Sequence, residues 1–131
     1  MSQQNVELVR RSFEAHRRGG IEASIPFYAP DLVWDAGPDW VEKRIYRGHD
    51  GARELDAIFL ESFEDYALEL RELHAAQDSV VALYQATGRI RGSGAPIRQP
   101  VGIVLSDFRD GTIGSVRSFF SWQEAIDAAP S

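Results

Sequence analysis

The sequence predicts one α+β domain, with helices packed on a curved antiparallel sheet. Its 131 residues suffice for one hydrophobic core and leave no room for a second domain. The first half alternates helical and short extended patterns, whereas the second half, from residue 66, repeats with a period of two. Helices that precede a run of antiparallel strands are typical of the α+β class.

Two helices and a short strand are predicted before residue 37. Apolar residues at helical spacing indicate an amphipathic helix over residues 2–18, which a pair of glycines ends. A shorter helix follows, interrupted by Pro26 and closed before Pro30. The alternation of DLVWDA, residues 31–36, predicts a short strand, and a Gly-Pro-Asp turn follows it.

A second short strand near residues 44–46 and a third helix after Gly48 complete the first half. The second half contains four alternating segments, over residues 66–74, 79–91, 97–108 and 112–122. Asp110-Gly111 is a strong hairpin signal between the last two. We therefore expect three helices in the N-terminal half and a meander of four long strands.

Composition and charge exclude several classes of function. The net charge of -6 repels phosphate backbones, so we expect no nucleic-acid partner. No apolar run approaches the roughly 20 residues of a membrane helix, and the N-terminal stretch lacks the features of a secretory signal, which predicts a cytoplasmic protein. Cysteine is absent, the histidines lack metal-ligand spacing, and no phosphate-binding glycine loop is found, so neither metal nor cofactor is expected.

Four stretches carry a family resemblance: VELVRRSFEAHRRGG, FYAPDLVWDAG, YRGHDGARELDAIFLESF and DFRDGTIGSVRSFFSWQEAIDA. Together they resemble the SnoaL-like branch of the nuclear transport factor 2-like, ketosteroid isomerase-like superfamily. The resemblance implies a cystatin-like cone, in which three helices wrap a curved sheet around a pocket. Members include isomerases, polyketide cyclases, epoxide hydrolases, dehydratases and proteins that only bind, so the fold does not settle the function.

The catalytic positions of ketosteroid isomerases are replaced in this chain. Those enzymes use an Asp general base and an oxyanion hole of Tyr and protonated Asp. By the resemblance, the Tyr position falls at Ser12, the base at Ala36 and the oxyanion Asp at Gly102. Enzyme and binding protein therefore stay open as alternatives.

His16 and Asp39 are the candidate acid or base groups. His16 lies four residues after Ser12 on the apolar side of the first helix, and an imidazole titrates near neutral pH. The alternative is a histidine that reaches solvent at the helix end. Asp39 follows the turn and could lean over a pocket mouth beside Trp40, although turns favour Asp in any case. If Ala36 faces the pocket, as the resemblance implies, Asp35 should point away from it, because neighbouring strand residues face opposite sides, although a bulge before Gly37-Pro38 could re-aim Asp35.

The remaining candidates form pocket walls. Trp34 should lie inside and Trp40 at the rim, with core packing as the alternative for Trp34. On the long strands, the phase that contains Gly102 faces the helices by the resemblance, and its small residues leave room for a ligand or for close packing. The predicted ligand-binding residues are Ser12, Trp34, Trp40, Tyr84, Ser106, Ser118 and Phe120.

The opposite phase is apolar as well, and it would expose Leu83, Ile103, Leu105 and Phe119 together. Most monomers do not show so large an apolar patch. We therefore expect a homodimer through the outer sheet face, with Arg89 and Arg117 in the interface.

Taken together, the sequence predicts a SnoaL-like small-molecule protein with an apolar pocket. As an enzyme it would be of the isomerase or cyclase type and would transfer a proton on a small hydrophobic carbonyl compound. The alternative is a non-catalytic module that binds a small ligand, or a dimeric scaffold with a packed interior.

Overall fold

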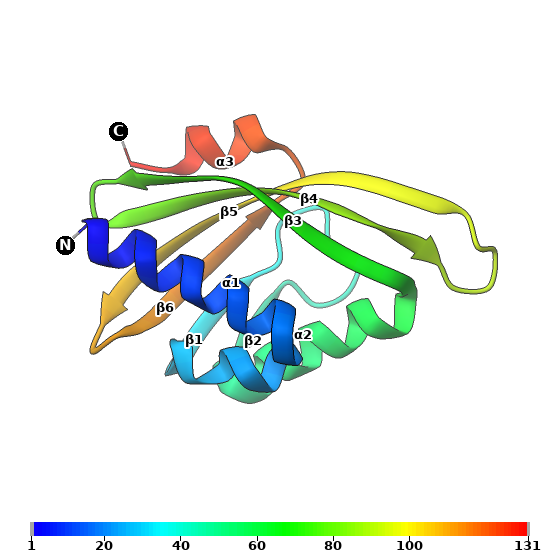
Figure 1. The fold of residues 1–131 in the computed structure, drawn as a ribbon, viewed down its shortest axis with the longest axis horizontal. Helices are drawn as coiled ribbons and strands as arrows, with labels where there is room; N and C mark the ends of the chain where they lie inside the picture. The colour runs from blue at the N-terminus through cyan, green and yellow to red at the C-terminus, as the bar shows by residue number, and fades with distance from the viewer. Residues whose placement is uncertain (1, 131) are drawn as a thin grey trace.

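The computed structural model describes residues 2–130, and its elements follow the predicted order almost throughout (Figure 1). They are α1 (Ser2–Ser24), a 3-10 turn η1 (Ile25–Phe27), β1 (Tyr28–Asp35), β2 (Ile45–Arg47), α2 (Gly48–Ser62), β3 (Phe63–Ala76), β4 (Ser79–Ile90), β5 (Pro96–Arg109), β6 (Thr112–Phe119) and α3 (Trp122–Ala128). Three helices and one six-stranded sheet of order β2-β1-β6-β5-β4-β3 confirm the α+β class. No helix among residues 2–130 combines the length and the apolar character needed to cross a membrane.

The two expected N-terminal helices form the two parts of α1, which kinks at the predicted break, where Gly20 takes φ 73° and ψ −163°, a conformation that glycine adopts readily. Two details differ from the prediction. A C-terminal helix, α3, was not predicted, and the last expected strand, over residues 112–122, overlaps it only at Trp122. β1 pairs parallel with β6, so the sheet is mixed rather than wholly antiparallel.

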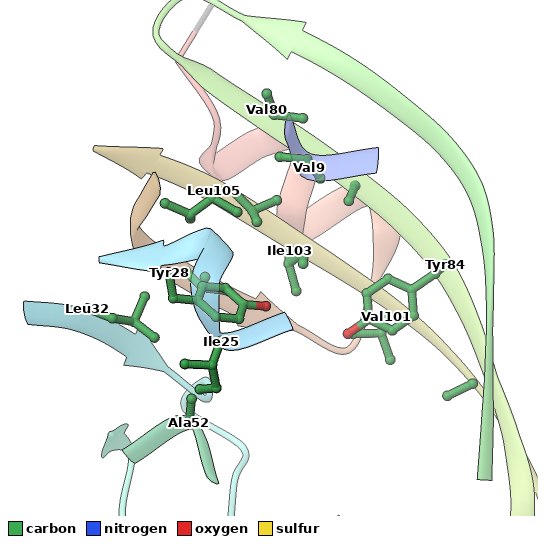
Figure 2. Close-up of a cluster of buried hydrophobic side chains, with 14 residues drawn as sticks. Val9, Ile25, Tyr28, Leu32, Ala52, Val80, Tyr84, Val101, Ile103 and Leu105 are labelled. Carbon is green, nitrogen blue, oxygen red and sulfur yellow. The ribbon is translucent and has the colours of Figure 1, made fainter. Parts of the chain in front are cut away.

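The main core lies between α1, α2 and the concave face of the sheet (Figure 2). It contains Val9 from α1, Leu32 from β1 and Leu105 from β5, all of which are essentially inaccessible to solvent. The helix α3 covers the opposite, convex face, which is here called the outer face (Figure 1). The sheet is therefore buried on both sides over part of its area.

The phase of β5 is the reverse of the predicted one. Ile103 and Leu105 belong to the main core, whereas Gly102 faces α3. The strand register explains the reversal, since Gly102 pairs with Leu83 and therefore shares its outer face. Gly102 is thus not a pocket residue.

The predicted exposed patch on the outer face is absent among the described residues, because α3 covers part of this face and the phase of β5 is reversed. Leu83 is only 3% exposed because it packs under Ala125 of α3. Ile103 and Leu105 point into the main core instead. Arg117 stays on the outer face, with its guanidinium carbon 5.4 Å from the centre of the Phe119 ring. The exposed apolar patch therefore no longer supports a homodimer, which stays a prediction.

Candidate functional site

A cavity of about 630 Å³ lies on the concave side of the sheet, toward the end where β4 turns into β5. α2 supplies Leu55 and Phe59 to its lining, and the sheet supplies Ala86 and Val101. The loop between β1 and β2 closes one side with Trp40 and Val41. Most of the lining side chains are apolar, as in sites that hold small organic molecules.

Aromatic rings form a continuous wall of this cavity. Trp40 lies with its ring centroid 5.1 Å from that of Phe59 and 6.4 Å from that of Phe120. Phe59 in turn stacks on Tyr66, with the centroids 5.3 Å apart. Rings held this way present flat apolar faces, which favour a planar ligand.

Both indole N–H groups in the wall are already hydrogen-bonded within the protein. The indole Nε1 of Trp34 donates to Ser118 Oγ at 3.1 Å, and that of Trp40 donates to the Tyr46 hydroxyl at 3.0 Å. The Tyr84 hydroxyl has no hydrogen-bond partner among residues 2–130. Burial raises the pKa of Tyr84, so its hydroxyl stays protonated and can donate a hydrogen bond.

Six of the predicted site residues line the cavity, namely Trp34, Asp39, Trp40, Tyr84, Ser118 and Phe120. Two others do not belong to it. The Ser12 hydroxyl donates to the Val9 carbonyl at 2.8 Å inside α1. Ser106 pairs with Ser115 and lies on the outer face, because the phase of β5 is reversed. The prediction that Ser12 and Ser106 contact a ligand is therefore corrected: neither residue lines the cavity.

His16 also lies outside the cavity lining. Its Nε2 is 3.0 Å from Asp56 Oδ1, and this contact links α1 to α2. The His16 side chain is 38% exposed and that of Asp56 is 17% exposed. The placement resembles the alternative that the sequence left open, a histidine near the helix end that reaches solvent, with the addition of a carboxylate partner.

Asp35 points away from the cavity and is held by an ion pair. Arg44 donates from Nε to Oδ1 at 2.8 Å and from Nη2 to Oδ2 at 3.1 Å, and the Gly37 amide donates to Oδ1 at 2.9 Å. The hydrogen bond from Arg44, aided by the Gly37 amide, lowers the pKa of Asp35. A carboxylate with these partners is a poor base.

Replacing Asp35 by Asn should therefore change stability in a pH-dependent way. We expect a loss of a few tenths to about 1 kcal/mol at pH 7. Because the folded-state pKa of Asp35 is lowered, its contribution is fully present above the ordinary value of 3.8 and is lost as the pH falls through the lower value. Urea unfolding at pH 6 and pH 3 measures this. A gap between wild type and variant that is equally wide at both pH values would contradict the assignment.

Several cavity residues were not predicted as site residues. Phe59 and Phe63 stand out in the sequence only as apolar positions of a helix, and Tyr66 only as the start of a strand. Phe63 and Tyr66 lie in β3, where residues three apart normally face opposite sides, and an irregularity in the strand register between Glu64 and Ala67 brings the two rings together, which no spacing in the sequence indicates. Among the described residues, no group of three or more His, Asp or Glu side chains could hold a metal ion.

Comparison with known proteins finds similarity to one domain family and to several solved structures. Residues 9–116 match the SnoaL-like domain. Among curated proteins, none matches the sequence. The structure is similar to that of a nuclear transport factor 2-like protein from Burkholderia xenovorans LB400. The two chains are 23% identical, with a TM-score of 0.76, and the match covers 98% of each chain.

Two further solved structures share the fold. One is a protein with a ketosteroid isomerase-like fold from Catenulispora acidiphila DSM 44928, in complex with trimethylamine; it is 18% identical, with a TM-score of 0.74, and the match covers 94% of this chain and 92% of that one. The other is TerC, co-crystallized with polyporic acid; it is 21% identical, with a TM-score of 0.77, and the match covers 95% of this chain and 99% of TerC.

Proposed function

Because the chain belongs to the SnoaL-like domain family, we propose that it binds a small, ring-bearing apolar molecule in the cavity between the helices and the concave face. The aromatic wall formed by Trp40, Phe59 and Phe120 is the observation that carries this proposal. A wall of flat rings with its indole donors already paired offers apolar contact and few competing hydrogen bonds. Tyr84 supplies one free donor to a ligand oxygen.

The fold relatives support a ligand of this kind. TerC, which has the same fold, was co-crystallized with polyporic acid. At 21% identity this likeness concerns the fold alone, so the ligand of TerC does not transfer to this chain. TerC supports the proposal only in showing that a protein with this fold was crystallized with an organic molecule.

The second candidate function is catalysis of the isomerase or cyclase type. Asp39 favours it, since it is the one carboxylate that lines the cavity among the described residues. In this scheme Asp39 removes a proton from the carbon next to a carbonyl group, and Tyr84 donates a hydrogen bond to the carbonyl oxygen. His16 could contribute only indirectly, because its imidazole contacts Asp56 outside the cavity lining.

Proton exchange of a bicyclic ketone separates the two functions. The probe is 2-tetralone in deuterated buffer, and NMR follows both its binding and the exchange of its acidic C–H protons. If Asp39 is a base, wild type should accelerate exchange, and Asp39→Asn should lose at least about 100-fold of that rate while it keeps its affinity. Glu42→Gln is the matched control, an exposed carboxylate of the same loop that is not part of the lining.

The outcomes are distinct. Binding without acceleration would support the binding protein and contradict the enzyme. Absence of binding by 2-tetralone and by other apolar ring compounds would contradict the proposed cavity function itself. In that case the dimeric scaffold with an unused interior would be favoured.

Homodimerisation through the outer face, a cytoplasmic location and the lack of a nucleic-acid partner stay part of the proposal. α3 leaves the ends of β4 and β5 toward their hairpin uncovered on this face (Figure 1). Arg89 lies there and forms no ion pair among residues 2–130. Sedimentation velocity at micromolar concentration should show a dimer, and a monodisperse monomer would contradict this part.

A further inference from the structure

Two buried tyrosines carry hydroxyls without partners. Tyr28 at the start of β1 and Tyr84 in β4 are each only 9% exposed. Neither hydroxyl forms a hydrogen bond with any residue in the range 2–130. Within the same range, no fully enclosed side-chain nitrogen or oxygen atom lacks a partner. The two oxygens must therefore be open to a molecule of at least the size of water.

The two hydroxyls face the same interior space. Figure 2 shows the Tyr28 and Tyr84 side chains extending toward one another from β1 and β4, with their oxygen atoms at the facing ends. The neighbouring core residues Val101 and Ile103 are aliphatic and offer no hydrogen bond. Trp34 lines the cavity and lies against Tyr28, with the ring centroids 5.7 Å apart. Tyr84 is itself part of the cavity lining, and Tyr28, which is not, adjoins that lining through Trp34.

Both phenol groups are hydrogen-bond donors under ordinary conditions. Burial is the main reason that the pKa of Tyr28 is raised, and the nearby Asp56 carboxylate raises it further. Burial likewise raises the pKa of Tyr84. Native proteins seldom keep buried polar groups unpaired, so a pair of converging free donors indicates a group that they bind.

We propose that Tyr28 and Tyr84 together bind the carbonyl oxygen of the cavity ligand. The ligand enters with this oxygen leading and leaves its apolar rings against the wall of Trp40, Phe59 and Phe120. This inference rests on the proposed function and adds to it Tyr28 as a second donor, the direction of the ligand, and its chemical class, an apolar ring compound with a carbonyl group.

A matched pair of probes tests the proposal. 9-Fluorenone and fluorene have nearly the same shape and differ by one carbonyl oxygen. Ligand titrations should show that wild type binds fluorenone about tenfold more tightly than fluorene. Tyr28→Phe and Tyr84→Phe should each weaken fluorenone binding about 3- to 10-fold and leave the affinity for fluorene within about twofold. The fluorene affinity of each variant is its own control for folding and cavity shape.

Infrared spectroscopy provides a second readout that a merely structural role would not change. The C=O stretch of bound fluorenone should lie below its frequency in hexane and should rise in each variant, because a hydrogen bond to the oxygen has been removed. Equal affinity for both probes would overturn the proposal, and so would a C=O stretching frequency in Tyr28→Phe identical to that in wild type. In either case the binding of fluorene would still support the proposed function. Failure of both probes to bind would contradict both. If Tyr28→Phe does not fold, the wild-type stretch decides, and a hexane-like frequency contradicts the proposal.

Discussion

Replacing Gly102 by Val is expected to lower the free energy of unfolding by about 1 to 3 kcal/mol. A Cβ at this position would collide with the Cβ of Ala125 in α3 and would also meet the Leu83 side chain. The Ala125 methyl group cannot turn aside, so α3 would have to move off the outer face. Urea unfolding, together with the near-UV signal of Trp122 in α3, measures both effects.

The control for this variant is Ser115→Val, which adds a similar side chain to the same outer face. Ser115 pairs with Ser106 and is only half-buried, so we expect a change within about 0.5 kcal/mol. Gly102→Val should also leave ligand affinity unchanged, since Gly102 does not line the cavity. A stable variant that has lost ligand binding would mean that Gly102 faces the cavity after all.

Replacing Trp40 by Ala is expected to weaken the binding of fluorene by at least about tenfold. Its indole is the link between Phe59 and Phe120, and it covers the loop side of the cavity. The fold should survive, because Trp40 is half-buried and lies in a loop outside the main core. The fluorescence anisotropy of fluorene reports the affinity without relying on tryptophan emission.

Phe119→Ala is the matched control for the loss of a ring. Phe119 is the neighbour of Phe120, but its ring lies on the outer face beside Arg117. We expect this variant to lose stability and to keep its affinity for fluorene within about twofold. Equal losses of affinity in the two variants would mean that the aromatic wall is not a binding surface.

The order of the elements could be predicted because the helical and the extended segments show different apolar periods and are separated by glycine and proline signals. The helix α3 was missed, although a signal for it exists. Ser121 is followed three residues later by Glu124, the spacing of a capping box, and the Glu124 amide donates to Ser121 Oγ in the structure. The two aromatic residues before Ser121 continue the strand pattern of β6, which concealed the start of the helix.

The site could be predicted only in part, for reasons of packing. With Ala36 facing the pocket, as the resemblance implies, the alternation of β1 predicts Trp34 toward the pocket and Asp35 away from it, and the structure places the two side chains in this way. For β5 the alternation is uninformative, because α3 buries its outer face and both phases are apolar. The contact of His16 with Asp56 joins positions 40 residues apart in the sequence. No local spacing indicates such a contact.

The most direct test of the central claim, that the cavity binds an apolar ring compound, is a titration of the ¹⁵N-labelled protein with fluorene, followed through the three tryptophan indole N–H resonances. Trp34 and Trp40 line the cavity, whereas Trp122 belongs to α3 on the outer face and donates to the Tyr84 carbonyl. We expect the Trp34 and Trp40 signals to shift several-fold more than that of Trp122. Shifts confined to Trp122, or no shift at saturating fluorene, would contradict the proposed site.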